Sequence, residues 1–174
     1  CDIGDVVQVR ESSTPGLVID SIIGADNIPL EPEKNVCTVA AQALLNSLEK
    51  KPSNGYSFSI TKKVAAGSGL GSSASSSAAA VVALNKLLGS PFSRHELIPF
   101  AMKGESLASG AEHADNVAPS ILGGFTLVQS YEPLRVVKLH YQEDLVATIV
   151  HPHVEEKTVD SKRILRQSIP LKNA

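Results

Sequence analysis

A glycine-rich turn runs directly into an alanine- and serine-rich stretch from Gly67 to Ala80, with the sequence GSGLGSSASSSAAA. Gly67, Gly69 and Gly71 stand at alternate positions, where they let the backbone turn tightly and approach a ligand without side-chain obstruction. The stretch that follows is typical of a helix, and the free N–H groups of a first helical turn favour anions. With the strand expected just before it, this segment predicts a cradle for phosphate.

The glycine spacing distinguishes this segment from two common phosphate-binding motifs. No lysine follows the last glycine, as it would in a Walker motif, and the spacing is G-x-G-x-G rather than G-x-G-x-x-G. The hydroxyls of Ser72 and Ser73 could cap the helix, and one of them could ligate Mg²⁺. The plainer alternative is a serine cap on a packing helix that follows a flexible turn.

The rest of the chain predicts strands on both sides of a central helical block. Strands are expected over 6–9, 17–23, 56–62, 125–129, 134–139 and 145–150, and helices over 35–51, from the glycine turn to about Leu88, from Ser93 onward, and over about 159–167. The turn SSTPG predicts that the first two strands form a hairpin. Ser93 and Glu96 form a capping box, and Pro99 predicts either a kink or a later helix start. This order indicates an α+β domain.

Composition and charge exclude several classes of protein. The 174 residues are long enough for one globular domain with its own core. The 16 basic and 18 acidic residues give a net charge of −2, and 4 Phe, 3 Tyr and no Trp leave few platforms for stacking bases. We therefore expect no binding of nucleic acid.

Two cysteines, Cys1 and Cys37, are too few for a disulfide framework or a metal cluster, which fits a reducing compartment. No apolar run approaches the ~18 residues that span a bilayer, and the first residues lack the features of a signal peptide. We expect a cytoplasmic protein that does not bind membranes.

A carboxylate interrupts an apolar helical stripe in the second half of the chain. Glu105 has helical spacing with Leu97, Ala101 and Ala108. A charge on a buried face needs a partner. The alternative is that a kink at Pro99 turns Glu105 into water.

The segment KVAAGSGLGSSASSSA, from Lys63 to Ala78, resembles the phosphate-binding motif of the GHMP kinases, usually written P-x-x-x-G-L-G-S-S-A. Ala65 stands where that family commonly has proline, which should loosen the entry to the loop. Within the family, HADNVAPSILGGF, from His113 to Phe125, is similar to a segment of the homoserine kinases. The resemblance implies an ATP-dependent kinase whose N-terminal-type domain packs a mixed or antiparallel sheet against helices.

The resemblance also implies roles for individual residues. The nucleotide's phosphates would lie against Lys63, Gly67, Ser68, Gly69, Leu70, Gly71, Ser72 and Ser73, and Ser73 and Glu105 would hold Mg²⁺. The substrate would be bound by His113, Asp115, Asn116 and Arg166, with Arg163 as the neighbouring alternative to Arg166. Asp115 and Asn116 are also the candidate catalytic residues: Asp115 could accept the hydroxyl proton, whereas Asn116 could only orient the oxygen. Whether a base is needed is open, because phosphoryl transfer depends mainly on positioning and charge neutralisation.

The leading interpretation is ATP-dependent phosphorylation of the side-chain hydroxyl of L-homoserine to O-phospho-L-homoserine, on the way to threonine. The alternatives are another kinase of the same family, such as a mevalonate kinase, and a non-catalytic fragment or degenerate paralogue. Because the family's P-A-T-x-A-N and C-terminal glycine-rich segments are absent, we expect 1–174 to be one incomplete ATP-binding domain, truncated at both ends. A second domain would be absent or only begun at about 145–174. A homodimer is one possible assembly, and the sequence does not determine the oligomeric state.

Overall fold

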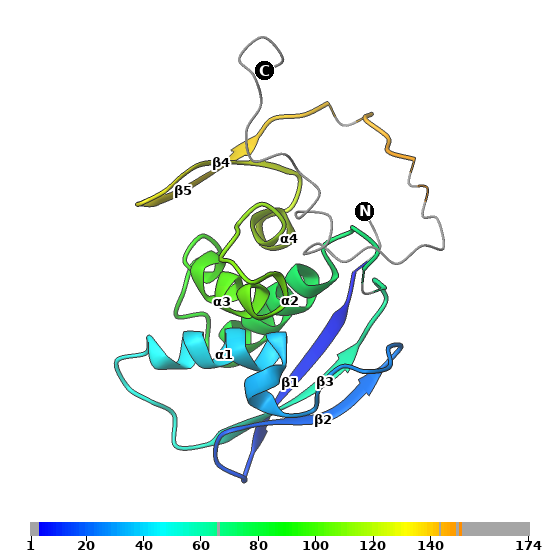
Figure 1. The fold of residues 1–174 in the computed structure, drawn as a ribbon. Helices are drawn as coiled ribbons and strands as arrows, with labels where there is room; N and C mark the ends of the chain where they lie inside the picture. Colours follow the sequence, from blue (N-terminus) through cyan, green and yellow to red (C-terminus); the bar gives the residue numbers. More distant parts are fainter. Residues whose placement is uncertain (1–3, 66, 143, 149, 151–174) are drawn as a thin grey trace.

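The structure is a computed structural model and describes residues 4–65, 67–142, 144–148 and 150. The elements, in chain order, are β1 (Val6–Ser12), β2 (Leu17–Ile23), the 3-10 helix η1 (Pro32–Lys34), α1 (Val36–Asn46), β3 (Gly55–Thr61), α2 (Ser72–Leu87), α3 (Leu97–Ser109), α4 (Val117–Leu122), β4 (Phe125–Tyr131) and β5 (Leu134–Leu139). Figure 1 shows α1, α2 and α3 packed together beside the β1–β3 sheet, with α4 next to them and the β4–β5 hairpin beyond α4. The predicted α+β class is confirmed.

The first two strands do not form the predicted hairpin. The sheet order is β1-β3-β2, with β1 antiparallel and β2 parallel to β3, so the sheet is mixed. The turn between β1 and β2 closes over the start of β3 instead, where a Cβ on Gly55 would lie 1.8 Å from the Thr14 carbonyl oxygen. The hairpin prediction was wrong because β3 is the most buried strand and takes the central position, with Tyr56, Phe58 and Ile60 in the core as their alternation predicted.

Helix α1 begins where the sequence predicts and ends earlier. The Asn35 side chain caps it by accepting the Cys37 N–H at 3.0 Å. At the other end, the N–H and the hydroxyl of Ser47 both donate to the Leu44 carbonyl, at 3.1 and 2.7 Å. These short-range bonds tighten and end the last turn, so Lys50 and Lys51 lie outside the helix that was expected to include them.

Helix α3 has the later start that was one of the two alternatives. The capping box forms, with the Ser93 N–H donating to Glu96 Oε2 at 2.8 Å and the Glu96 N–H to Ser93 Oγ at 3.4 Å. The helix proper begins at Leu97, which places Pro99 in the first turn. A proline there costs no helical hydrogen bond, because first-turn N–H groups have no helical acceptor.

Two other predictions around the C-terminal part need correction. Helix α4 was missed, because Pro119 and the following glycines favoured a loop, yet Pro119 sits in its first turn. The strand expected over 145–150 is absent from the described residues 145–148 and 150, which are exposed and have no strand beside them. The helix expected over 159–167 lies outside the described residues. Within the described part of the chain, no helix is both long and apolar enough to span a bilayer.

Candidate active site

The glycine-rich turn adopts the backbone that its spacing predicts. Gly67, Gly69 and Gly71 have φ of +71°, +73° and +72°, while Ser68 and Leu70 between them keep negative φ. Alternation of left-handed glycines with ordinary residues turns successive N–H groups toward one side and makes an anion-binding concavity. We name residues 65–71 the phosphate loop, after the phosphate cradle that the sequence predicts.

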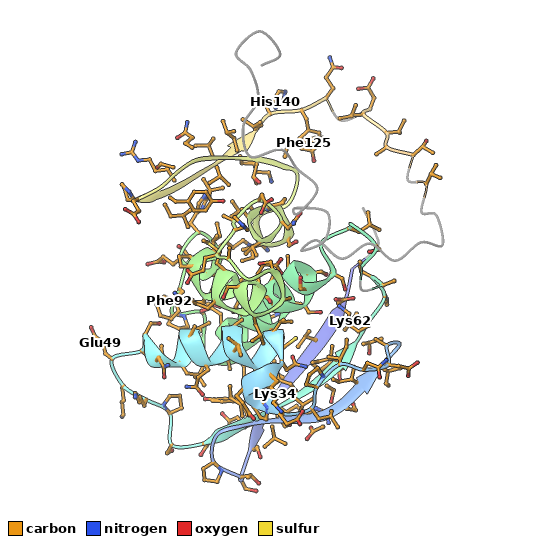
Figure 2. All side chains as sticks on the ribbon, in the orientation of Figure 1. Lys34, Glu49, Lys62, Phe92, Phe125 and His140 are labelled. Atoms are coloured by element: carbon orange, nitrogen blue, oxygen red, sulfur yellow. The ribbon has the colours of Figure 1, made fainter. Side chains whose placement is uncertain are left out.

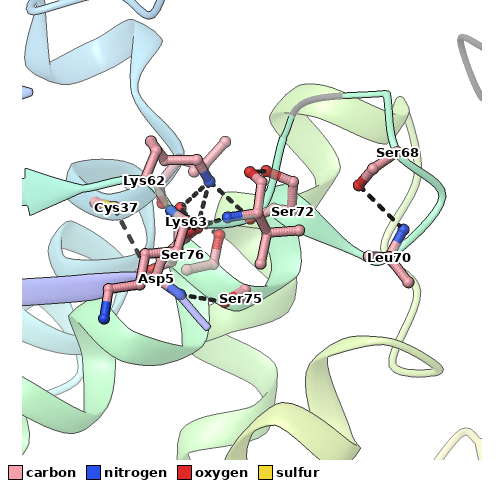
Figure 3. Close-up of polar contacts among 12 residues, drawn as sticks. Asp5, Cys37, Lys62, Lys63, Ser68, Leu70, Ser72, Ser75 and Ser76 are labelled. Carbon is pink, nitrogen blue, oxygen red and sulfur yellow. Dashed lines mark hydrogen bonds and ion pairs between the residues drawn. The ribbon is translucent and has the colours of Figure 1, made fainter. Parts of the chain in front are cut away.

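Helix α2 begins at the end of the phosphate loop, with Gly71 at its N-cap. The first helical hydrogen bond runs from the Ser75 N–H to the Gly71 carbonyl at 2.8 Å. The N–H groups of the residues before Ser75 in the first turn therefore have no acceptor within the helix. The predicted capping by Ser72 or Ser73 is wrong, because both serines are already helical. The Ser72 hydroxyl instead donates to the Val64 carbonyl at 2.8 Å and closes the neck of the loop (Figure 3).

A buried ion pair that sequence reasoning missed lies under this neck. Lys62, labelled in Figure 2, follows β3 directly, and its ammonium contacts the carboxylate of Asp5. The two side chains are 4% and 0% exposed. Lys63, the lysine assigned to the nucleotide, has an exposed side chain, while its backbone N–H donates to Asp5 Oδ1 at 2.9 Å. The alternation of β3 would have placed Lys62 on the buried face, but nothing near Asp5 indicated its partner.

Burial raises the pKa of Asp5, but hydrogen bonds from Lys62, from Ser76 and from the backbone N–H groups of Lys63 and Val64 outweigh it. The pKa of Asp5 therefore lies below its ordinary value of 3.8. Asp5 is ionised at neutral pH, and the pair with Lys62 is a true ion pair.

This lowered pKa predicts a dependence of stability on pH. The stabilisation by Asp5 is complete above its unfolded-state pKa near 3.8 and is lost as the pH falls through its lower folded-state pKa. Urea unfolding of the wild type and of Asp5→Asn, measured from about pH 6 to about pH 3, should show a difference in unfolding free energy that shrinks with falling pH. A difference that stays constant across this range would contradict the assignment.

The HADN segment, residues 113–116, lies against the phosphate loop. A Cβ added to Gly71 would lie 3.3 Å from both Cβ and Cγ of Asn116, so the Asn116 side chain is in contact with the last glycine. Asn116 precedes α4, and the Ala114 N–H donates to the Tyr131 hydroxyl at 3.2 Å. Asp115 and Asn116 are exposed, and His113 is half-buried. The two motifs that sequence analysis singled out are therefore neighbours in space.

Glu105 is buried on α3, with 7% of the residue exposed. The alternative, in which a kink at Pro99 turned it into water, is wrong, although Ala108 of the same predicted stripe is exposed. The preceding residue, Gly104, faces α2: a Cβ there would lie 2.7 Å from Ser77 Oγ, one helical turn after Ser73. Glu105 thus belongs to the α3 segment that packs against the first half of α2.

The described residues contain no group of three His, Cys, Asp or Glu side chains that could hold a metal ion by themselves. One buried carboxylate and one serine hydroxyl suit Mg²⁺, which is usually held by one or two carboxylates together with substrate phosphates. Arg166 and its alternative Arg163 lie outside the described residues.

Comparison with known proteins decides the family. The model of the GHMP kinases N terminal domain matches residues 35–124. The chain belongs to the GHMP kinase family. The match includes the phosphate loop, Glu105 and the HADN segment, so the expected resemblance to GHMP kinases is confirmed.

Several GHMP kinases are similar over nearly the whole chain. Homoserine kinases from Chloroherpeton thalassium and Chlorobium phaeobacteroides are 40% and 44% identical over 98% and 96% of this chain, and over 56% and 53% of their own lengths. A solved homoserine kinase from Cytophaga hutchinsonii superposes with a TM-score of 0.92 at 47% identity, over 99% of this chain and 54% of that one. The chain spans about half the length of the curated relatives it matches.

A mevalonate kinase from Methanococcus jannaschii shares the GHMP fold, with a TM-score of 0.63 at 17% identity over 80% of this chain and 47% of that one. Identity this low supports the fold alone.

Proposed function

We propose that this chain is the ATP-binding part of a kinase that phosphorylates the side-chain hydroxyl of L-homoserine to O-phospho-L-homoserine. The observation that carries the proposal is the contact between Gly71 and Asn116, because it puts a polar segment suited to a small substrate beside an anion-binding loop. The similarity to homoserine kinases over 96–98% of the chain supports the choice of substrate.

The phosphate loop supplies the groups that a triphosphate needs. Its left-handed glycines and the first turn of α2 offer backbone N–H donors and the positive end of a helix dipole. We assign the terminal phosphates to Gly67 through Ser73, with the exposed Lys63 side chain as an additional cation near the neck.

Mg²⁺ is assigned to the Ser73 hydroxyl and the Glu105 carboxylate, both of which are hard oxygen ligands. When bound, the ion would neutralise charge on the terminal phosphates. The burial of Glu105 strengthens any charge interaction it makes, since little water screens it.

The acceptor is assigned to the HADN segment and, outside the described residues, to Arg166. The side chains of Asp115 and Asn116 suit the ammonium and hydroxyl groups of an amino acid, and the guanidinium of Arg166 suits its carboxylate. The acceptor hydroxyl forms the new P–O bond while the bond to ADP breaks. Asp115 could accept the released proton, and we assign Asp115 and Asn116 first to substrate binding.

The proposal is tested by a coupled assay of ADP release with the full-length gene product. We expect release that depends on both Mg²⁺ and homoserine, with O-phosphohomoserine identified by ³¹P NMR. Mevalonate should neither replace homoserine nor compete with it, because it lacks the ammonium group. Turnover with mevalonate would identify the alternative kinase, and absence of homoserine-dependent ADP release would refute the proposal.

The contact between the two motifs gives a prediction of its own. In Gly71→Ala, the left-handed backbone costs about 1–2 kcal/mol, and the new Cβ displaces Asn116, which lies 3.3 Å away. We expect the KM values for ATP and for homoserine both to rise, each by about tenfold.

Gly69→Ala is the matched control, since Gly69 has the same left-handed φ of +73° but no atom within 4 Å of its Cβ position. It should raise the KM for ATP and leave that for homoserine within about twofold. Equal effects of the two variants on homoserine would contradict the proposed contact.

A further inference from the structure

A single carboxylate, that of Asp5, accepts hydrogen bonds from residues on both sides of the phosphate loop. Before the loop, Asp5 Oδ1 accepts the N–H groups of Lys63 and Val64, at 2.9 and 3.1 Å. After the loop, Asp5 Oδ2 accepts the Ser76 hydroxyl at 2.6 Å, and the Asp5 N–H donates to Ser75 Oγ at 3.2 Å. Asp5 comes from the segment before β1, so a third part of the chain joins β3 to α2 (Figure 3).

Lys62 completes this connection. Its ammonium donates to Asp5 Oδ2, to the Ser72 carbonyl at 3.1 Å and to Ser76 Oγ at 2.7 Å. An ammonium has three N–H donors, so these contacts use all of them. Lys62 therefore has no donor left for a phosphate oxygen, unlike a lysine that grips the nucleotide directly.

We propose that Asp5, Lys62 and Ser76 form a clamp that fixes the two ends of the phosphate loop and thereby positions it for the nucleotide. Resting on the proposed function, this inference makes Asp5 and Lys62 positioning residues rather than catalytic ones. With both ends fixed, the loop loses less conformational entropy when it closes on phosphates, and binding is correspondingly tighter.

The burial of the ion pair favours a role in positioning the phosphate loop over a role in stabilising the fold. Both side chains are almost fully buried, and a buried ion pair often adds little net stability over neutral groups of similar size. Removal of only one partner strongly destabilises a protein, because it leaves a buried charge without compensation. The clamp should therefore be probed by removing both charges together.

The test compares the full-length wild type with Asp5→Asn/Lys62→Met, in which both charges are lost and the side-chain sizes are nearly kept. Hydrogen exchange without nucleotide should accelerate by about tenfold in peptides covering 65–73, with helices α1 and α3 unchanged. Binding of Mg²⁺–ADP should weaken by about tenfold, and the KM for homoserine should stay within about twofold.

The matched control removes an exposed ion pair, Lys34–Glu31, by Glu31→Gln/Lys34→Met. Neither loop exchange nor nucleotide affinity should change in it. Ser76→Ala, which removes one member of the clamp without stranding a charge, should give a smaller acceleration confined to the same peptides. It keeps the inference testable if the double variant does not fold.

The clamp would be overturned if the double variant folds and its hydrogen exchange over 65–73 is as slow as in the wild type. Faster hydrogen exchange spread evenly over the whole chain would also overturn it. Because the exchange measurement uses neither ATP nor homoserine, it separates the clamp from the proposed function. Absence of kinase activity in the wild type would refute the proposed function and leave the clamp to be decided by exchange alone.

Discussion

Glu105→Gln in the full-length gene product should lower kcat for phosphoryl transfer on the order of 10²- to 10³-fold, the usual cost of removing one group that stabilises transition-state charge. Glutamine keeps the size of the buried side chain and removes the negative charge assigned to Mg²⁺. The measurement is steady-state kinetics at several Mg²⁺ concentrations, in which the variant should also need more Mg²⁺ for half-maximal rate.

Glu33→Gln serves as the control for this charge change, because Glu33 is an exposed residue on η1, outside the assigned site. It should keep wild-type kinetics. If Glu105→Gln folds and retains a wild-type Mg²⁺ dependence, Glu105 is not a metal ligand.

Gly104→Ala should lower the free energy of unfolding by about 1 to 3 kcal/mol, the range expected when an extra methyl group is forced into a packed interface. The added Cβ would lie 2.3 Å from the Val36 carbonyl oxygen and 2.9 Å from Ala40 Cβ, both on α1. Helix propensity alone predicts the opposite sign, a gain of about 1 kcal/mol. Urea denaturation followed by circular dichroism distinguishes the two.

Gly4→Ala is the comparison for this substitution, since no atom lies within 4 Å of the Cβ position at Gly4. It should change stability by less than about 0.5 kcal/mol. A Gly104→Ala protein as stable as the wild type would mean that α3 can move away from α1 without loss.

Local patterns predicted the parts of the fold that depend on local physics. The alternation of Tyr56, Phe58 and Ile60 gave β3 its buried face, and the small residues after the glycines gave α2. The burial of Glu105 followed from helical spacing, because a side chain three or four positions from buried residues shares their face.

The failures concern partners that are distant in sequence. Nothing local shows that β3 comes between β1 and β2, because the strand order depends on pairing between segments that are far apart in the chain. The contact of Asp5 with Lys62 spans 57 positions, and Asn116 meets Gly71 across a comparable stretch. The strands β4 and β5 were both predicted from their own residues, and the structure pairs them with each other, whereas the described residues 145–148 and 150 form no strand.

A crystal structure of the full-length gene product with homoserine, Mg²⁺ and a non-hydrolysable ATP analogue tests the central claim most directly. We predict that β- and γ-phosphate oxygens accept hydrogen bonds from backbone N–H groups between Gly67 and Ser73, with Mg²⁺ ligated by Glu105. Phosphates bound elsewhere, or a metal ion out of reach of the Glu105 carboxylate, would contradict it.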